Sequence, residues 1–513
     1  MTINLQQLNA QRAGVGMSAL NSADYPLAAC LGGLNTRDSL ASMDEKDAIE
    51  LQNIIPGTGS VRIRRGSTSW ATGLESNVET LAELHAGSIR KFIAAASSKI
   101  FDITATGSAI EIGTGYSNAR WQYVKFGSLI SILWMCNGQD IPIMYDGSVI
   151  TNTSLSGDVT PTSVIGVHAF KSRLYLIEVN SQDFFYGGVN AVQGSFTRFP
   201  LSRVAKQGGN LLSIKSITRD GGDGADDLIA FFMTTGEIIV YRGSDPGDAE
   251  NWSLVGRFNV PAPIADRGVI ELGSDIVFIA HGDVIRLTDV LDKKNLITSQ
   301  SKLCGAISDA VDTYTNNYGW QSFHYPNGNY VIFNIPVSTN QTYIQYGFNT
   351  LTGAAFKFTN QNSRTWGLFN ENIFFGGNGQ VFKANDGLND NDNNIDIICQ
   401  TAFSFLGTKI NKEVTQVVPV VKIDGNASLN IGVAYDYGNI SISQLVETVS
   451  VGSPWDTSLW DVTFWSPESV PRTDPYGIEG SGKTASIKIA SSLKNQDFEL
   501  SQIYFGMIGL DGF

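Results

Sequence analysis

The segment GIEGSGKT, Gly477 to Thr484, matches the phosphate-loop pattern G-x-x-x-x-G-K-[ST] at every fixed position. In proteins that bind nucleotides through this pattern, backbone N–H groups of the loop surround the phosphates and the lysine reaches them. A buried strand must lead into such a loop and a helix must leave it, because the helix N-terminus completes the anion site. The neighbouring elements therefore decide what this segment does.

Neither flank of GIEGSGKT has the required form. The upstream segment SPESVPRTDPY contains three prolines, which cannot donate to a central strand of a sheet. Downstream, TASIKIASS places Ile487 and Ile489 with a period of two, which indicates a strand rather than a helix. We predict a glycine-rich hairpin turn that leads into a strand, with Gly480 and Gly482 supplying backbone freedom and Lys483 exposed. A nucleotide-driven motor remains a hypothesis that rests on this segment alone.

Histidines and cysteines are few and far apart. None of the histidines has a metal-ligand or triad spacing with another, and the cysteines form no C-x-x-C pair. A disulfide framework or a zinc site is therefore not expected, and the cysteines are interpreted as buried free thiols. The residues concerned are His85, His168, His281 and His324, and Cys30, Cys136, Cys304 and Cys399.

Two acidic loops offer oxygen atoms of the kind that calcium prefers, Asp220 to Asp227 and Asn385 to Asp396. The second loop has Ile395 where the calcium-loop pattern needs glycine, and no terminal glutamate follows. We interpret both loops as solvated turns. The G-x-S-x-G pattern and the repeated S-x-D-x-G-x-x-W boxes of sialidase propellers are also absent. The sequence therefore predicts no catalytic residues, no cofactor and no metal ion.

The densest basic cluster lies in the segment VRIRRG. Its alternation places Arg62 and Arg64 on one face of a strand and Val61 and Ile63 on the other, with Arg65 following. One hypothesis is that the three arginines contact DNA phosphates or an acidic partner. The alternative is a solvated strand face that pairs with the chain's own carboxylates.

Composition favours turn-rich β structure. The chain has 513 residues, 53 of them glycine, with 10% aromatic and 16% charged residues, whereas helical bundles need more charge. The formal net charge of −14 argues against a dedicated nucleic-acid binder, but not against a wall past which DNA slides. We expect no secretory signal and no membrane span, because the N-terminus lacks a basic and apolar leader and no apolar run is long enough.

The pattern of strands divides the chain into three parts. Residues 1–84 are expected to form an extended arm, a short helix over about 43–52 and a platform strand. Residues 85–397 repeat short apolar hairpins every 40–55 residues, which is roughly the length of a propeller blade and predicts six to eight blades. Residues 398–513 form longer alternating strands, predicted to be a β-sandwich or barrel that completes the platform. Within it, Trp455, Trp460 and Trp465 are placed in a loop.

Several segments resemble a family of bacteriophage virion proteins. The stretch Gly32 to Leu74 resembles the opening of that family, where G-G-L-N-T-R-D is followed by D-A-x-x-L-x-N and P-x-x-G-x-V-x-x-R-x-G. The family comprises the tail nozzle or tail hub proteins of short-tailed phages, also called tail tubular protein B or packaged-DNA stabilisation proteins. The resemblance continues in NGQDIPIMYDGS, FKSRLYLIE, DGGDGADDLIAFFMTTGEIIVYRGSDPGDAENWSLVGRFNVPAPIADRG, LGTKINKEV and the WD-rich segment.

The resemblance implies a non-enzymatic propeller subunit in a homo-oligomeric ring, commonly a hexamer, within the head–tail connector complex. The ring would extend the DNA channel below the portal and adaptor, help retain packaged DNA, conduct it on ejection and carry fibres or spikes. DNA would pass without sequence-specific binding. The N-terminal and C-terminal segments would join into the platform, with the strand Arg62 to Arg65 near the adaptor.

The protein would then be assembled in the host cytoplasm and reside in the virion tail. A receptor-binding or glycan-processing β-propeller at the tail tip remains the alternative, and it needs an exposed aromatic groove with paired carboxylates.

Overall fold

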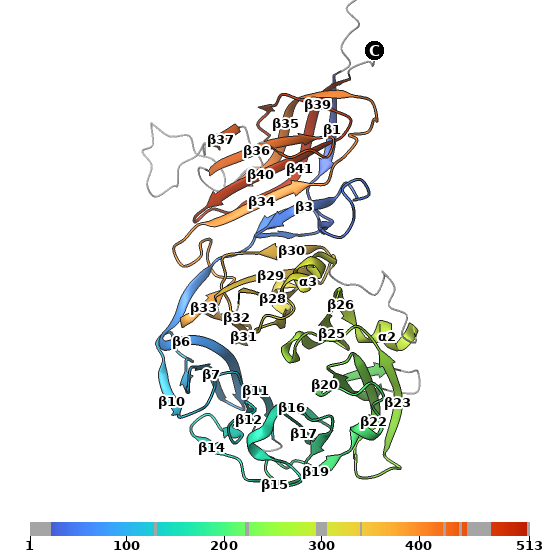
Figure 1. Cartoon of the computed structure of the whole chain (residues 1–513). Coiled ribbons are helices and arrows are strands. Elements are labelled where there is room, and N and C mark those ends of the chain that lie inside the picture. The colour runs from blue at the N-terminus through green and yellow to red at the C-terminus, as the bar shows by residue number, and fades with distance from the viewer. Residues whose placement is uncertain are drawn as a thin grey trace, which may run out of the picture.

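The computed structural model describes residues 22–509, except 128–130, 221–224, 294–304, 339–340, 424–426, 441–443 and 449–472. The fold is all-β, with a propeller ring and a platform beside it (Figure 1). The described helices are two α-helices and five 3-10 turns: α2 (Leu287–Lys293), α3 (Ser308–Tyr314), η1 (Pro161–Ser163), η2 (Leu201–Arg203), η3 (Asp266–Gly268), η5 (Gly305–Ile307) and η6 (Pro326–Gly328). No described helix is long and apolar enough to cross a bilayer.

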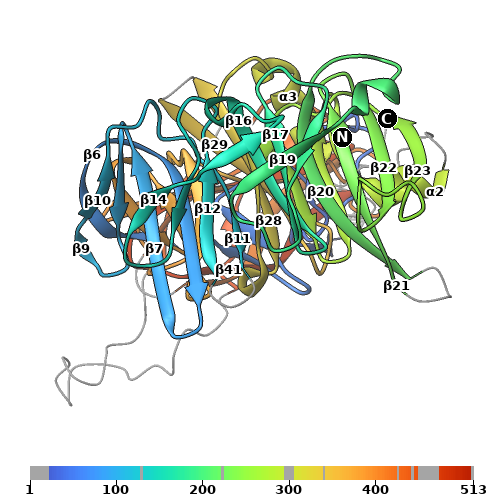
Figure 2. The ribbon, with the colours of Figure 1, turned by 90° about the horizontal axis from the view of Figure 1, so that it is seen from below.

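Four sheets of the ring are separate blades (Figure 1), and Figure 2 shows the first three of them from below. The first contains β11 (Gln122–Phe126), β12 (Ile132–Cys136), β13 (Ile143–Tyr145) and β14 (Ile150–Asn152). The second contains β15 (Leu155–Gly157), β16 (Val164–Phe170), β17 (Arg173–Glu178), β18 (Phe184–Tyr186) and β19 (Gly194–Phe199). The third contains β20 (Leu211–Asp220), β21 (Ala225–Met233), β22 (Glu237–Gly243) and β23 (Trp252–Asn259). The fourth contains β24 (Val269–Leu272), β25 (Asp275–Ala280) and β26 (Asp283–Arg286).

The rest of the ring belongs to two larger sheets. An eight-stranded sheet contains β6 (Ser67–Ala86), β7 (Ile89–Ala96), β8 (Lys99–Asp102), β9 (Gly107–Ser108), β10 (Ile110–Thr114), β31 (Thr365–Phe369), β32 (Asn372–Gly376) and β33 (Asn378–Ala384). The 20 residues of β6 pair with β33 in one half and with β7 in the other. The prediction of six to eight blades is therefore wrong: four blades are separate, because β6 joins two groups of strands into one sheet.

The buried central strands of the blades, such as β12, are apolar on both faces because each blade packs between two neighbours. In β12, Leu133 and Met135 pack toward β7 of the eight-stranded sheet, whereas Trp134 and Cys136 pack toward β17 of the next blade. Successive side chains of a strand point to opposite faces, so this alternation divides one strand between two cores. Burial of each large apolar side chain contributes about 1.5–3 kcal/mol. The cores between blades therefore hold the ring together.

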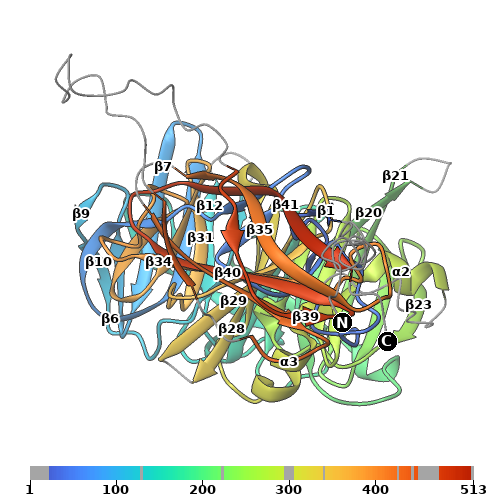
Figure 3. The same ribbon diagram turned by 90° about the horizontal axis from the view of Figure 1, so that it is seen from above.

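The platform is a sandwich of two sheets built from both ends of the chain (Figure 3). A ten-stranded sheet contains β27 (Gln321–Tyr325), β28 (Tyr330–Ser338), β29 (Thr342–Asn349), β30 (Ala355–Phe358), β2 (Gly33–Leu34), β3 (Asp47–Gln52), β34 (Ile395–Thr401), β40 (Ala485–Leu493), β36 (Ala427–Tyr435) and β37 (Gln444–Thr448). Its β27–β30 end belongs to the ring (Figure 1). The seven-stranded sheet contains β1 (Ser22–Ala28), β4 (Ile54–Pro56), β5 (Val61–Ile63), β35 (Lys412–Ile423), β38 (Tyr476–Gly477), β39 (Ser481–Gly482) and β41 (Phe498–Gly509).

This architecture confirms the prediction of a propeller with a platform made of the N-terminal segment and a C-terminal sandwich. The domain limits lie elsewhere than the sequence indicated. The limit at residue 84 falls inside β6, so the ring begins at Ser67, and the limit at residue 397 falls inside the platform strand β34. A continuous strand that serves two sheets leaves no break in the sequence pattern.

The helix expected over residues 43–52 is wrong. Residues Asp47–Gln52 form strand β3, which pairs with β2 and β34. Ala48 and Leu51 are buried in the platform core. Pairing on both sides satisfies the backbone more completely than an isolated helical turn, so the tertiary context overrides the local capping pattern.

Candidate functional site: the axial cavity and the platform junction

A cavity of about 780 Å³ lies on the axis of the ring. Its wall comes from β6, β11, β16, β20, β24, β27 and β31, which are contributed by the sheets around the ring. Charged and aromatic side chains share this wall. The charged side chains are Arg120, Glu178, Lys215, Asp266 and Arg267, and the aromatic side chains are Tyr123, Tyr318, Phe323 and Trp366.

The turn η3 places Asp266 and Arg267 at the cavity wall. Arg267 donates from Nη1 to the carbonyl oxygen of Glu79 at 2.7 Å and from Nη2 to the carbonyl oxygen of Trp121 at 2.7 Å. Gln122 Nε2 donates to the Asp266 carboxylate. The arginine thus ties the fourth blade to β6 and to the segment before β11, which fixes the inner edges of separate sheets relative to one another.

A second arginine reaches the same carboxylate. Arg120 Nη2 lies 3.6 Å from Asp266 Oδ1, and its guanidinium lies 4.6 Å from the centre of the Tyr318 ring. Burial lowers the pKa of Arg267 to about 10, so it stays charged at neutral pH. Burial opposes ionisation of Asp266, but Arg120 and Arg267 hold its pKa below the ordinary value. This part of the cavity therefore holds an ionised and paired group.

A second group of charges is less completely paired. Lys215 on β20 lines the cavity, and among the described residues no ion pair is found for it. His168 on β16 has its Nε2 atom 3.9 Å from Glu271 Oε1 and without a hydrogen-bond partner in the described structure. Burial, with Lys215 nearby, lowers the pKa of His168 to about 4, and burial also lowers the pKa of Lys215. His168 is therefore neutral at pH 7.

Glu271 of β24 faces this group from the neighbouring blade. Its Oε1 accepts hydrogen bonds from the Ser216 backbone N–H at 2.9 Å and from the Ser216 hydroxyl at 3.0 Å. Burial opposes its ionisation, but the Ser216 N–H, His168 and Lys215 hold its pKa below the ordinary value. Asp266 at the cavity wall and Glu271, which is not among the residues that line the cavity, are thus both held in the charged form.

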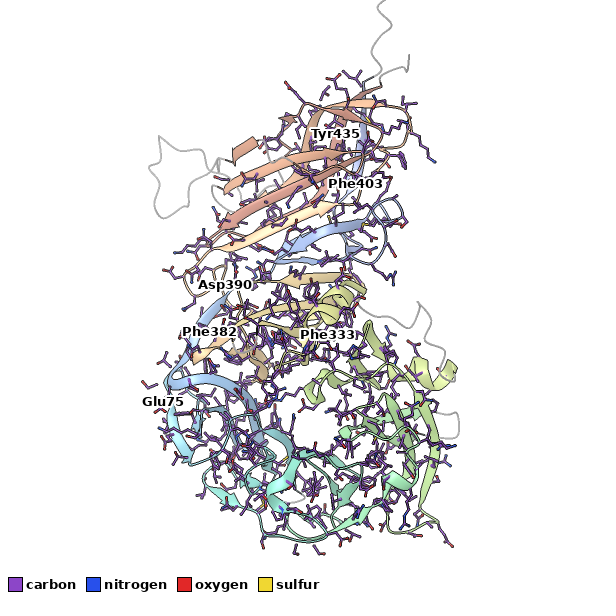
Figure 4. All side chains as sticks on the ribbon, in the orientation of Figure 1. Glu75, Phe333, Phe382, Asp390, Phe403 and Tyr435 are labelled. Carbon is purple, nitrogen blue, oxygen red and sulfur yellow. The ribbon has the colours of Figure 1, made fainter. Side chains whose placement is uncertain are left out.

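The platform junction is the second candidate site, and it contains the predicted arginines. Arg64 lies in the interior with 2% of its side chain exposed, and it pairs with Asp390, which Figure 4 shows between ring and platform. Arg64 Nη1 lies 2.9 Å from Asp390 Oδ1, and Nη2 donates to Oδ2. Further donor contacts go to Asn53 Oδ1 at 2.9 Å and to the Thr359 carbonyl oxygen at 3.1 Å. Arg64 therefore has an internal role and is not available to a partner in this fold.

Arg62 and Arg65 remain at the surface. Arg62 is 62% exposed and pairs with Glu499 at 2.8 Å, and Arg65 is 47% exposed and lies 3.5 Å from Asp497. The alternation expected of the segment holds through Ile63, since β5 is buried, exposed and buried in turn. After Ile63 the strand ends, and the chain turns Arg64 inward. The hypothesis of a partner contact now concerns Arg62 and Arg65.

GIEGSGKT leads into strand β40, and Lys483 is exposed, as predicted. The predicted hairpin is wrong, because β38 and β39 both pair with β35 and not with each other. The turn after β39 instead crosses from one sheet of the platform to the other. Asp436 Oδ1 accepts the backbone N–H groups of Lys483 at 2.8 Å and Thr484 at 3.0 Å. The chain's own carboxylate therefore takes the donors that a phosphate would need.

Carboxylates of the second acidic loop form ion pairs with basic side chains of the same chain. Asp390 pairs with Arg64, and Asp392 pairs with Lys494 at 2.7 Å. No group of acidic, histidine or cysteine side chains suited to a metal ion occurs in the described part of the chain. The loop DGGDGADD joins β20 to β21, with residues 221–224 outside the described residues. Trp455, Trp460 and Trp465 also lie outside them.

The charged residues of the cavity were not recognised from the sequence as candidate site residues. Lys215 stands in LLSIKSI, an apolar strand in which a lone charged residue is a usable signal. Asp266 and Arg267 stand in a short irregular segment between strands, where no periodicity indicates which way a side chain points. The ring brings these residues together from separate sheets, and that proximity is not visible from their spacing.

No protein-family model and no curated protein matches the sequence. Among solved structures, the extracellular domain of a hybrid two-component system from B. thetaiotaomicron is similar over 62% of this chain and 40% of that one, with 12% identity and a TM-score of 0.41. YCF48 bound to D1 peptide is similar over 68% of this chain and 98% of that one, with 9% identity and a TM-score of 0.37. Raptor from Chaetomium thermophilum is similar over 66% and 28%, with 10% identity and a TM-score of 0.37. The chain therefore spans less than half the length of the first of these.

Proposed function

We propose that this chain is a structural virion protein of a short-tailed phage. It would be a tail nozzle or hub subunit whose copies, commonly six, form a ring that continues the DNA channel, helps retain packaged DNA and conducts it on ejection. The observation that carries the proposal is the platform, in which β1 and β41, from opposite ends of the chain, are paired over the 7 residues of β1. The resemblance of residues 32–74 to the nozzle family implies such a platform.

The DNA channel of the proposed ring lies between copies of the chain. The axial cavity of one copy has about 780 Å³, which is the range of small-molecule sites, about 300–1,000 Å³. Arg267 and Trp366 are among the side chains at its wall. On this proposal the net charge of −14 gives the channel a wall that repels DNA phosphates and limits sticking. A ring whose narrowest part is lined by lysine and arginine would contradict that role.

Electron microscopy of particles from the phage that encodes the chain tests the proposal directly. An antibody against the platform, detected with gold, should label the tail below the head. The purified protein, alone or with the portal-side tail proteins, should form rings in negative stain. Particles that carry no label, together with a chain that stays monomeric beside those proteins, would exclude a nozzle role.

The exposed arginines supply a site-specific test. Reversal of both charges, Arg62→Glu with Arg65→Glu, should reduce attachment to the adaptor, because both side chains project from the platform. Lys483→Glu is the matched control, since Lys483 is also exposed on the platform but lies in a different segment. Equal attachment by both variants would show that Arg62 and Arg65 are not the adaptor contact.

A receptor-binding or glycan-processing propeller at the tail tip is the second candidate. One feature of the axial cavity favours this candidate: Tyr318 and Trp366 lie in the same wall as the carboxylate of Asp266. A glycosidase needs one protonated carboxyl as general acid, whereas the pKa of Asp266 is lowered. Asp266 is therefore better suited to binding a glycan than to acting as the general acid. Two incubations distinguish the candidates. Cleavage of host polysaccharide would support a tail-tip enzyme, and hydrolysis of ATP in a separate incubation would support a motor.

A further inference from the structure

Two cysteines that lie far apart in the sequence meet inside the platform. Cys30 Sγ and Cys399 Sγ are 3.0 Å apart, although 369 residues separate them. Their side chains are 1% and 2% exposed, and both belong to the platform core. Cys136, in contrast, is buried in the ring between two blades. The three described cysteines are therefore not equivalent, and one pair is placed for a reaction between thiols.

The positions of Cys30 and Cys399 determine which parts of the platform a bond between them would join. Cys30 lies in the segment between β1 and β2, where the N-terminal strand leaves the seven-stranded sheet and enters the ten-stranded one. Cys399 lies in β34, paired with Leu51 of β3 and Ile489 of β40, in the interior of the ten-stranded sheet. A covalent bond between the two sulfur atoms would join the connection that follows β1 to the middle of the platform.

We propose that Cys30 and Cys399 form a disulfide bond that fastens the N-terminal strand to the platform. The oxidant is a small disulfide such as oxidised glutathione. The Cys30 thiolate attacks one glutathione sulfur, which releases one glutathione thiolate and leaves a mixed disulfide. The Cys399 thiolate then attacks the Cys30 sulfur and releases the second glutathione. Two cysteine thiols are oxidised and one glutathione disulfide is reduced, and the two protons that the cysteine thiols lose are taken up by the two glutathione thiolates that leave.

Burial decides when this reaction takes place. The Cys399 thiol beside Cys30, together with burial, raises the pKa of the Cys30 thiol, so that it is protonated and unreactive in the folded chain. Oxidation therefore takes place while β1 is undocked, either during folding or by opening of this strand. Among the described strands, β1 pairs with β41 alone, so it can separate without disrupting another of these strands. Once formed, the bond is shielded by the same burial from soluble reductants.

Refolding in a glutathione buffer tests the pair. The full chain is reduced, unfolded in guanidinium and diluted into a mixture of oxidised and reduced glutathione. It is then acid-quenched, alkylated and mapped by mass spectrometry of its peptides. We expect a peptide pair linked through Cys30 and Cys399 as the main disulfide, and a Tm above that of the same chain refolded with dithiothreitol in place of the glutathione mixture. The pair would form in any setting that becomes oxidising, so the test is independent of a role in a virion.

Matched variants exclude unspecific oxidation. Cys136→Ser should keep both the linked peptides and the shift in Tm, whereas Cys30→Ser and Cys399→Ser should each lose both. A refolded chain with native circular dichroism and with Cys30 and Cys399 fully alkylated would overturn the proposal, as would a main disulfide that involves Cys136. If the chain does not refold, the same peptide map is made on protein expressed in cells with an oxidising cytoplasm. Linked peptides of Cys30 and Cys399 would then support the proposal, and full alkylation of both cysteines would overturn it.

Discussion

The platform junction and the axial cavity both hold charged side chains away from bulk water, but they satisfy them differently. At the junction, Nε, Nη1 and Nη2 of Arg64 all donate to acceptors, among them both carboxylate oxygens of Asp390. At the cavity wall, Lys215 has no ion pair within the described structure. His168, which does not line the cavity itself, has no hydrogen-bond partner for its Nε2 atom in the described structure. One region is closed by its own contacts, and the other has unused hydrogen-bonding capacity at or beside a cavity.

This difference indicates which charged side chains stabilise the fold and which are available for binding. A buried ion pair with all its donors used is costly to break, because removal of one partner leaves an uncompensated charge. A charge that lacks a partner has already lost hydration without full compensation, so its removal costs little or increases stability. The junction is therefore expected to be sensitive to substitution, and the cavity tolerant of it at neutral pH.

The largest effect is expected at the junction. Arg64→Met should lower the free energy of unfolding by about 3–5 kcal/mol, because it leaves the Asp390 carboxylate buried without its partner. Chemical denaturation followed by circular dichroism measures this loss. Arg62→Met is the matched control: its pair with Glu499 is exposed, so the loss should stay below about 1 kcal/mol. Equal losses in the two variants would show that the junction is not a distinct structural centre.

The next effect concerns His168 and depends on pH. The pKa of His168 is about 4 in the fold against 6.5 ordinarily, so between these values the unfolded chain binds a proton that the folded chain does not. Stability therefore falls as the pH falls through this window, by on the order of 2–3 kcal/mol. The carboxylate of Glu271, whose pKa is also lowered, acts in the same direction at lower pH.

Unfolding curves between pH 7 and pH 4 check this prediction. In His168→Gln the fall over the upper part of the window should be smaller, because the variant has no imidazole to protonate. His85→Gln, at an exposed position of β6, should keep the dependence of the wild-type chain. If His168→Gln also keeps it, the imidazole is not held neutral by the cavity.

The sequence allowed the class of fold to be predicted, because the alternation of short apolar strands is a local property. The same local reasoning failed at residues Asp47–Gln52, where pairing with β2 and β34 turns a helical capping pattern into a strand. It also failed for the number of blades, because β6 continues through two groups of strands without a break. Local patterns thus indicate elements, whereas their grouping into sheets depends on distant partners.

The candidate sites were less predictable than the fold. Arg64 was identified as a basic residue, but its partner Asp390 is 326 residues away and was interpreted as part of a solvated turn. Cys30 and Cys399 were interpreted as separate thiols for the same reason. Only GIEGSGKT could be judged from its flanks, since the strand that follows it is encoded next to it. Sites built from distant residues need the fold before they can be recognised.

A smaller effect on the free energy of unfolding is expected for a substitution of Lys215 in the cavity. Lys215→Met should leave the free energy of unfolding unchanged or raise it by up to about 1 kcal/mol, because a poorly hydrated ammonium without an ion pair is replaced by an apolar side chain of similar length. Thermal and chemical unfolding at pH 7 measure it. Lys488→Met is the matched control, since Lys488 Nζ lies 2.6 Å from Glu50 Oε2, and its loss should destabilise the platform. A loss for Lys215→Met as large as that for Lys488→Met would mean that Lys215 is structural.

The smallest effect is expected in the turn that matches the phosphate-loop pattern. Lys483→Ala should change the free energy of unfolding by no more than about 0.5 kcal/mol, because the side chain is exposed. The contacts that fix the turn involve the backbone: Asp436 accepts the N–H groups of Lys483 and Thr484, and Lys412 Nζ donates to the Lys483 carbonyl oxygen at 2.5 Å. Asp436→Ala should therefore destabilise the platform more than Lys483→Ala does, by about 0.5–1.5 kcal/mol, since it removes the acceptor of these N–H groups. Calorimetric titration of the wild-type chain with ATP completes the test: heat of binding that Lys483→Ala abolishes would show that the turn can open to a phosphate, whereas traces without heat of binding for both chains are expected if Asp436 keeps the backbone N–H groups of the turn.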